Sequence, residues 1–127
     1  MIDHVSIAVA DLRQSAAFYD AVLAPLGLTR LTESDVRVGF GKTYPEFWIN
    51  LRRDLAPVAT DSGCHVCLRA PDRDAVVRFH AAALRLGGAD DGAPGERQAT
   101  VTTPFGAFIR DCDGNRIEAV TFPRKPV

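Results

Sequence analysis

The sequence predicts an α+β domain made of two tandem βαβββ modules, whose curled mixed sheets surround a cavity. This prediction rests on an internal repeat and on the apolar patterning within each copy. The segment from Asp3 to Gly27 recurs from Cys64 to Gly88 at a constant offset of 61 residues. Each copy has an alternating strand pattern followed by a helical apolar stripe. The identical pairs are His4/His65, Val5/Val66, Asp11/Asp72, Phe18/Phe79, Ala21/Ala82, Leu23/Leu84 and Gly27/Gly88.

The chain has the length and composition of one globular domain, covering residues 1–127. It is 46% hydrophobic and 24% charged, with a formal net charge of −1. Such a charge gives no field that would attract nucleic acid or an anionic membrane, and the apolar runs are too short to span a bilayer. Polar Asp3 and His4 argue against a signal peptide, and three cysteines suit a reducing compartment. We therefore expect a cytoplasmic protein without nucleic-acid or membrane partners.

The first module is expected to cover about residues 1–53. Asp11 can cap a helix, and Pro25 and Gly27 can end it. The expected elements are a strand at 2–9, a helix between Asp11 and Gly27, and short strands at 36–40 and 46–52 with a turn at 41–45. Together they predict the βαβββ order for this module.

A surface linker at 54–63 is expected to lead to the second module, at about residues 64–123. Asp72 can cap its helix and Gly87 can end it, while Gly114 suits a turn that needs positive φ. The expected elements are a strand at 64–70, the helix, a Gly/Pro-rich loop at 90–98 and a hairpin formed by strands at 106–110 and 116–122.

A group of polar residues is expected on the sheet faces that the helices leave uncovered. The apolar strand faces must lie against the helices, so His4 and His65 point to the opposite side. Strand alternation places Glu118 there as well, and alignment of residues 47–51 with 115–119 makes Asn50 its repeat partner. Two imidazoles and a carboxylate can bind a borderline divalent metal. A lone strand histidine is usually structural, but recurrence in both copies makes metal ligation about as probable as a structural role.

Strand alternation predicts that several other side chains point to the same cavity. Cys67 lies on the face of His65, and Trp48 and Phe108 can form an apolar wall, although simple packing explains them equally well. Several cations with the same alternation could hold an anionic substrate: Arg52, Arg69, Arg110 and Arg116. His80 lies on the predicted helix, next to its apolar stripe, and is expected at the surface without a functional role.

Three segments resemble a known superfamily: DHVSIAVADLRQSAAFYDAVLAPLGL at the start, CHVCLRA in the second copy and FIRDCDGNRIEAV near the end. They are similar to the vicinal oxygen chelate superfamily, which includes glyoxalase I, bleomycin-resistance proteins and extradiol dioxygenases. The resemblance implies the glyoxalase/bleomycin resistance/dioxygenase fold, a homodimer and a divalent metal such as Fe, Mn, Zn or Ni. It implies His4, His65 and Glu118 as the metal ligands.

The resemblance also bears on the reaction. Asn50 stands where glyoxalase I has an acidic ligand that also acts as a base, which disfavours that activity and leaves a His-His-Glu set like that of the dioxygenases. We expect a metal-dependent enzyme, dioxygenase-like or lyase/isomerase-like, acting on a small substrate with vicinal oxygens. Glu118 and Asn50 would act in catalysis, with Asn50 orienting the substrate or a water. The alternative is a non-enzymatic, small-molecule-binding protein of the bleomycin-resistance type.

Overall fold

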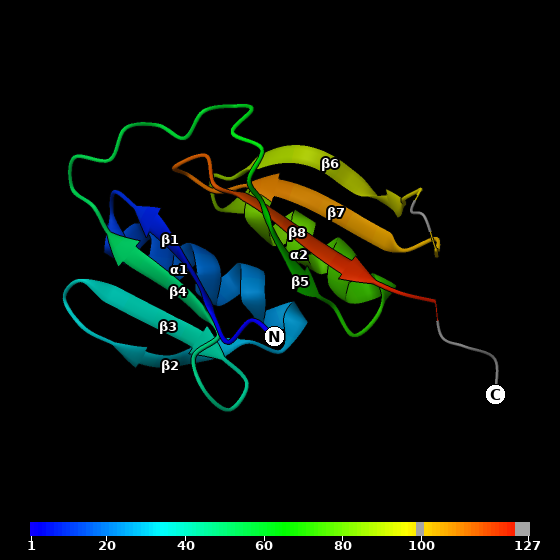
Figure 1. The fold of residues 1–127 in the computed structure, drawn as a ribbon, viewed down its shortest axis with the longest axis horizontal. Helices are drawn as coiled ribbons and strands as arrows, with labels where there is room; N and C mark the ends of the chain where they lie inside the picture. Colours follow the sequence, from blue (N-terminus) through cyan, green and yellow to red (C-terminus); the bar gives the residue numbers. More distant parts are fainter. Residues whose placement is uncertain (99–100, 124–127) are drawn as a thin grey trace.

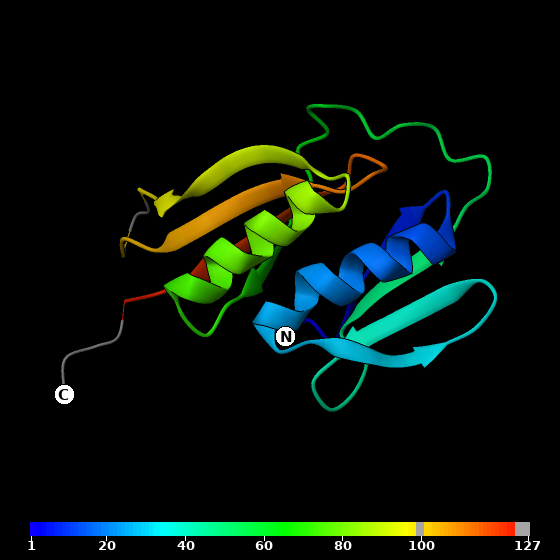
Figure 2. The ribbon, with the colours of Figure 1, turned by 180° about the vertical axis from the view of Figure 1, so that it is seen from behind.

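The computed structural model describes residues 1–98 and 101–123, which form two four-stranded sheets that each carry a helix on one face (Figures 1 and 2). The first module contains β1 (Val5–Val9), α1 (Leu12–Leu23), the 3-10 helix η1 (Ala24–Leu26), β2 (Thr29–Glu33), β3 (Arg37–Gly41) and β4 (Phe47–Leu51). The second contains β5 (Val66–Arg69), α2 (Arg73–Arg85), β6 (Ala89–Glu96), β7 (Phe105–Arg110) and β8 (Arg116–Thr121).

The two sheets have the same topology. Their strand orders are β1-β4-β3-β2 and β5-β8-β7-β6. β1 pairs parallel with β4 and β5 pairs parallel with β8, while the remaining pairs are antiparallel. This correspondence confirms the predicted duplication of a βαβββ module. It also leaves β1 and β5 as edge strands, each hydrogen-bonded on one side within its own sheet.

The hydrophobic core lies between the helices and the sheets. Asp11 caps α1 by accepting from the Gln14 N–H at 3.0 Å, and Asp72 caps α2 in the same way from the Ala75 N–H at 2.8 Å. Behind these caps, Phe18 and Phe79 occupy matching buried positions. Figure 2 shows α1 and α2 in front of the two sheets, on the same side of the molecule. None of the helices in the described part of the chain is long and apolar enough to cross a membrane.

Two edge strands were not located from the sequence. β2 is exposed along its whole length, so it lacks the apolar alternation that identifies a half-buried strand. β6 covers most of the segment that was predicted to be a loop at 90–98, and that prediction is wrong. An edge strand tolerates glycine and proline because only one of its sides is paired. The pairing of β6 with β7 accordingly shifts register around Gly92 and Gly95.

The prediction that His80 lies at the surface is also wrong. Its exposed fraction is 9%, and its Nε2 lies 2.9 Å from Oδ1 of Asp90 on β6. The hydrogen bond from His80, followed by one from the Gly92 N–H, lowers the pKa of Asp90. The imidazole therefore joins α2 to an edge strand on the helix side of the sheet, a role that the helical stripe alone did not indicate.

A buried hydrogen bond joins the two modules. The Tyr19 hydroxyl on α1 donates to Oδ2 of Asp111, in the turn between β7 and β8, at 2.6 Å. Oδ1 of Asp111 accepts the backbone N–H groups of Asp113 at 3.0 Å and Asn115 at 2.8 Å. The Asn115 amide in turn donates to the Ala8 carbonyl at 2.9 Å. The turn of one module is thus fixed to the helix and first strand of the other.

Removing this hydroxyl should destabilise the protein. Tyr19→Phe keeps the aromatic packing but removes one of the two donors to Oδ2 of Asp111, the other being the Asn115 side-chain amide at 2.9 Å. We expect a loss of about 1–3 kcal/mol in the free energy of unfolding. Urea unfolding followed by circular dichroism measures it. Tyr44→Phe is the matched control, because Tyr44 is 49% exposed. Equal unfolding midpoints for the two variants would contradict the assigned role of Tyr19.

Candidate metal and substrate site

The strand register arranges the predicted site residues in rows on the helix-free faces, the sheet surfaces opposite α1 and α2. In the second module, Cys67, Glu118, Phe108 and Gly92 are consecutive partners across β5, β8, β7 and β6. Side chains of directly paired residues point to the same face. Glu118 therefore shares its face with both the thiol of Cys67 and the ring of Phe108, as the alternation predicted.

His65 and Glu118 form the centre of this group. Nε2 of His65 lies 3.3 Å from Oε1 of Glu118, and the two side chains are 39% and 14% exposed. The His65 ring meets Phe108 edge to face, with 5.5 Å between the ring centroids. Gly106 leaves room beside the carboxylate, because a Cβ there would stand 3.4 Å from Oε2 of Glu118. An imidazole nitrogen and a carboxylate oxygen are thus close enough to bind one cation.

The first module presents a related but weaker set of groups. His4 is 54% exposed, and its Nδ1 lies 2.7 Å from Oδ1 of Asp3. The Asn50 amide donates to the Ser6 hydroxyl. Trp48 lies on the same strand face as Asn50. Its ring lies over Gly39, where a Cβ would be 2.9 Å from Cζ3 of the indole. This face therefore offers one imidazole, one amide and an aromatic wall.

One chain does not gather all the predicted ligands. Within residues 1–98 and 101–123, no group of three or more His, Cys, Asp or Glu side chains could hold a metal ion. The modules form separate sheets, so His4 and Asn50 belong to one module and His65 and Glu118 to the other. That these four residues face one cavity therefore stays a prediction.

A groove of 390 Å³ lies between the edge strands of the two sheets. Its lining comes from β1, from the linker and from the region around β5: Val5, Ser6, Ile7, Val58, Ser62, Cys64, His65, Val66, Asn115 and Arg116. Ser6 and His65 line the same groove, so the two partial sets of site residues open toward neighbouring strand edges.

The remaining predicted residues lie at different distances from this centre. Loss of hydration, followed by the nearby Glu118 carboxylate, raises the pKa of Cys67 to about 12. Arg69 lies at the far end of β5 from His65, with its guanidinium 4.9 Å from the ring centroid of Phe122. Arg52 is exposed and donates to the neighbouring Leu51 carbonyl at 2.9 Å. Cys67 thus belongs to the centre, whereas the two arginines lie apart from it.

Arg116 lies beside the residues around His65 and Glu118. Its guanidinium carbon lies 4.2 Å from the ring centroid of Phe108. It pairs with Asp91, to which Arg110 also approaches at 3.6 Å. Strand alternation had predicted this face for both arginines. Asp91 was not predicted to join them, because it falls in the segment 90–98 that was predicted to be a loop. These residues add a basic region beside His65 and Glu118.

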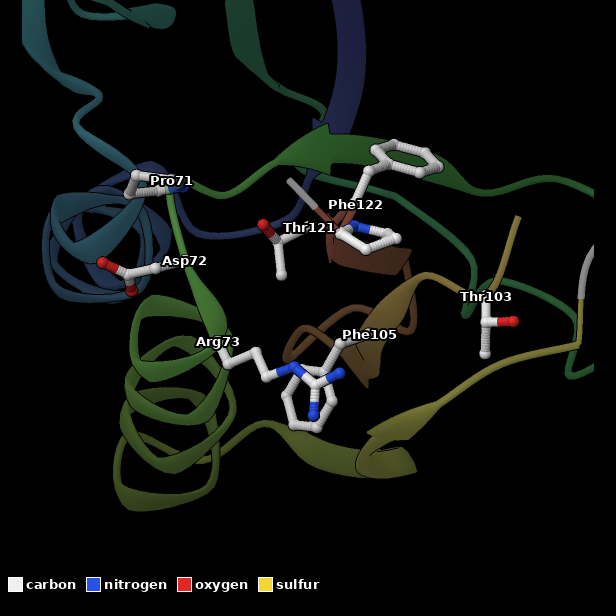
Figure 3. Close-up of a pocket in the computed structure, with 8 residues that line it drawn as sticks. Pro71, Asp72, Arg73, Thr103, Phe105, Thr121 and Phe122 are labelled. Atoms are coloured by element: carbon white, nitrogen blue, oxygen red, sulfur yellow. The ribbon is translucent and has the colours of Figure 1, made fainter. Parts of the chain in front are cut away.

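A separate cavity of 190 Å³ lies near the end of β5 that is remote from His65 (Figure 3). Figure 3 shows the Arg73 guanidinium against the Phe105 ring, and its distance from the ring centroid is 4.8 Å. Arg73 also pairs with Glu96 at 3.2 Å, and the neighbouring Asp72 carboxylate caps α2. The charged groups of this cavity therefore already have partners within the fold.

The chain matches a known protein family and solved structures with the same fold. The family model described as "Glyoxalase/Bleomycin resistance protein/Dioxygenase superfamily" matches residues 1–119. A solved glyoxalase/bleomycin resistance protein from Albidiferax ferrireducens T118 is 31% identical, with a TM-score of 0.83 over 94% of this chain and 97% of that chain. No curated protein matches the chain.

More distant structures share the fold alone. A glyoxalase/bleomycin resistance protein/dioxygenase family enzyme from Burkholderia phytofirmans PsJN is 16% identical, with a TM-score of 0.71 over 96% of this chain and 98% of that chain. The V278E mutant of glyoxalase I from Zea mays is 21% identical, with a TM-score of 0.72 over 93% of this chain and 44% of that chain. The fold is therefore common to proteins whose sequences differ widely.

The raised pKa of Cys67 can be tested by alkylation. In a chelator-treated Cys64→Ser/Cys112→Ser variant, the pKa of Cys67, raised to about 12 although the side chain is exposed, should make iodoacetamide react more slowly with the folded than with the unfolded chain at pH 8.5. Adding Glu118→Gln removes the neighbouring negative charge, lowers the pKa and should speed the reaction severalfold. Mass spectrometry measures both rates, and the urea-unfolded variant is the control. A folded-state rate equal to the unfolded rate would contradict the assignment.

Proposed function

Because this chain belongs to the glyoxalase/bleomycin resistance protein/dioxygenase superfamily, we propose that it is a metal-dependent enzyme acting on a small substrate with vicinal oxygens. The observation that carries the proposal is the approach of His65 Nε2 to Glu118 Oε1 at 3.3 Å on the helix-free face. The internal repeat strengthens it, since His4 stands at the position equivalent to His65.

The chemistry of these donors fits a borderline divalent cation. Neutral imidazole nitrogen and carboxylate oxygen suit iron, manganese, zinc and nickel, the metals expected from the sequence. The second module of one chain supplies two such donors, His65 and Glu118. A catalytic site of this type normally has three protein ligands. The exposed imidazole of His4 is the remaining candidate, and in one chain it belongs to the other sheet.

A second copy of the chain can complete the set. β1 and β5 are edge strands, and unpaired edges of this kind favour pairing with another chain. A two-fold homodimer uses the same surface on both subunits, so contacts occur in reciprocal pairs. Each of two equivalent sites would then receive His4 from one subunit and His65 and Glu118 from the other.

The chain's own residues would bind and orient the substrate around this centre. When bound, the divalent cation would polarise the substrate's vicinal oxygens and stabilise negative charge on them. Two aromatic rings would form apolar walls that limit access of water. They are Phe108, which contacts His65, and Trp48, which lies over Gly39. Asn50 would donate a hydrogen bond to the substrate or to a water, since an amide cannot accept a proton from carbon at neutral pH.

Metal analysis tests the proposal directly. We expect one divalent ion per chain in protein purified without chelators, measured by inductively coupled plasma mass spectrometry. His4→Ala and His65→Ala should each remove the ion, because each leaves two ligands. His80→Gln should retain it, because His80 pairs with Asp90 on the helix side. Wild-type protein that binds no metal under any supply would favour the alternative of a non-enzymatic small-molecule-binding protein.

Complementation separates a shared site from one within a single chain. In a dimer of one His4→Ala subunit and one His65→Ala subunit, one site keeps its full ligand set and the other loses both histidines. Differently tagged, coexpressed subunits should therefore bind one ion per two chains, whereas each homodimer binds none. Sedimentation at micromolar concentration verifies the dimer. A monomer, or no recovery of metal in the mixed dimer, would exclude the shared site.

Asn50 determines the expected reaction class. Proton abstraction beside a carbonyl requires a base within hydrogen-bonding reach, with a pKa near the working pH. The wild type should therefore show little isomerisation of a hemithioacetal, whichever metal is supplied, and Asn50→Glu should increase it. Asn50→Gln is the control, because it lengthens the side chain and keeps the amide. Robust turnover of the hemithioacetal by the wild type would show that Asn50 is no obstacle to this chemistry.

A further inference from the structure

We propose that Arg116 and Arg97 form an anion subsite around Phe108, which selects substrates that carry a carboxylate in addition to their vicinal oxygens. The assignment of the ligand as part of the substrate rests on the proposed function. The subsite itself is made entirely of residues from the second module. Its existence can therefore be tested independently of metal binding and of dimerisation.

The first component is Arg116, which lies over the ring of Phe108 at 4.2 Å from its centroid. The same ring contacts His65, with 5.5 Å between centroids, and Phe108 is the direct strand partner of Glu118. One aromatic ring therefore contacts both this guanidinium and the proposed metal ligand His65, and both residues line the same groove. A group bound by Arg116 would lie beside the proposed reaction centre rather than at a remote surface.

The second component is Arg97, whose side chain folds back along β6 toward the same ring. Its Nη2 donates to the Ala93 carbonyl at 2.5 Å. A Cβ at Gly92 would lie 3.3 Å from this Nη2 and 3.2 Å from Cδ2 of Phe108, and a Cβ at Gly95 would lie 3.2 Å from Nη1. The two glycines thus provide the space that the guanidinium occupies. This close approach gives the glycines of β6 a function besides permitting its bulges.

The charges around Phe108 are unevenly balanced. Asp91 is shared by two guanidiniums, those of Arg110 and Arg116. Arg110 is further held by hydrogen bonds to the carbonyls of Thr60 and Gly114. Arg116 meets Asp91 through its Nε and remains 36% exposed, while the guanidinium of Arg97 donates to a carbonyl instead of a carboxylate. The Glu118 carboxylate lies on the same face, beside His65. Three guanidiniums therefore stand against two carboxylates, which leaves an excess of positive charge around the ring.

A carboxylate is the ligand that matches these groups. Its two oxygens lie in one plane and can accept two parallel hydrogen bonds from the fork of a guanidinium. Charge-assisted hydrogen bonds of this kind are roughly twice as strong as neutral ones. A neutral amide of the same shape keeps one acceptor oxygen but brings donors toward the cations. Comparing a carboxylate with its amide therefore isolates the contribution of the charge.

The experiment is a nuclear magnetic resonance titration of the chelator-treated, ¹⁵N-labelled protein with benzoate and with benzamide. Benzoate should shift the side-chain Nε–H signals of Arg97 and Arg116 and should bind at least tenfold more tightly than benzamide. Arg116→Gln and Arg97→Gln should each weaken benzoate binding by roughly tenfold, since each removes one charged donor. Arg85→Gln, on the exposed side of α2, should leave it unchanged.

Several results would overturn the proposal. They are equal affinities for benzoate and benzamide, no benzoate binding, an equal loss in Arg85→Gln, or inorganic phosphate binding as tightly as benzoate. A parallel titration of metal-loaded protein uses 3,4-dihydroxybenzoate and 4-methylcatechol, and Arg116→Gln should abolish the preference for the former. If the wild type binds no metal but still prefers benzoate, the proposed function fails while the subsite stands.

Discussion

The placement of the two modules depends on the buried hydrogen bond from Tyr19 to Asp111. The sheets do not share a hydrogen-bonded ladder, so helix packing, this bond and the hydrogen bonds from Asn115 to Ala8 and from Ala10 to Asp113 hold them together. A buried carboxylate is costly unless its oxygens are hydrogen-bonded. Asp111 satisfies both oxygens, through the phenol of Tyr19 and the N–H groups of its own turn. β8 begins directly after that turn, so the bond also fixes the strand that carries Arg116 and Glu118.

Strand alternation allows β8 to serve the core and the candidate site together. Ile117 and Ala119 are fully buried toward the helix, while Arg116 and Glu118 point to the helix-free face. The polar side chains thus stand on a strand whose other face is packed in the core, which limits their movement more than a loop would. The cost of placing a carboxylate there is limited, because Glu118 lies beside His65 and retains some exposure.

The two modules carry related residues that differ in charge. His4 and His65 occupy equivalent positions, but Asn50 is neutral where its counterpart Glu118 is acidic. The second module also carries Arg97 and Arg116 around Phe108, whereas the first has Trp48 across Gly39. Under the proposed function, the second module would bind the cation and an anionic group. The first module would supply a single imidazole and an apolar wall. The proposed homodimer would bring these unlike modules of two chains together.

The repeat and the apolar alternation were enough to predict a duplicated module and the faces of the residues on β1, β4, β5, β7 and β8. The 61-residue repeat and the alternation of apolar residues were sufficient to place Cys67, Phe108 and Glu118 on one surface, because side-chain direction in a strand has a period of two. The three-dimensional arrangement was needed to find that, among the described residues of one chain, His4 does not join His65 and Glu118 in a three-residue metal-binding group. It also revealed β6, the burial of His80 and the positions of Asp91 and Arg97. An edge strand is held by backbone hydrogen bonds to one neighbour, so its side chains need not carry the apolar pattern by which strands are recognised.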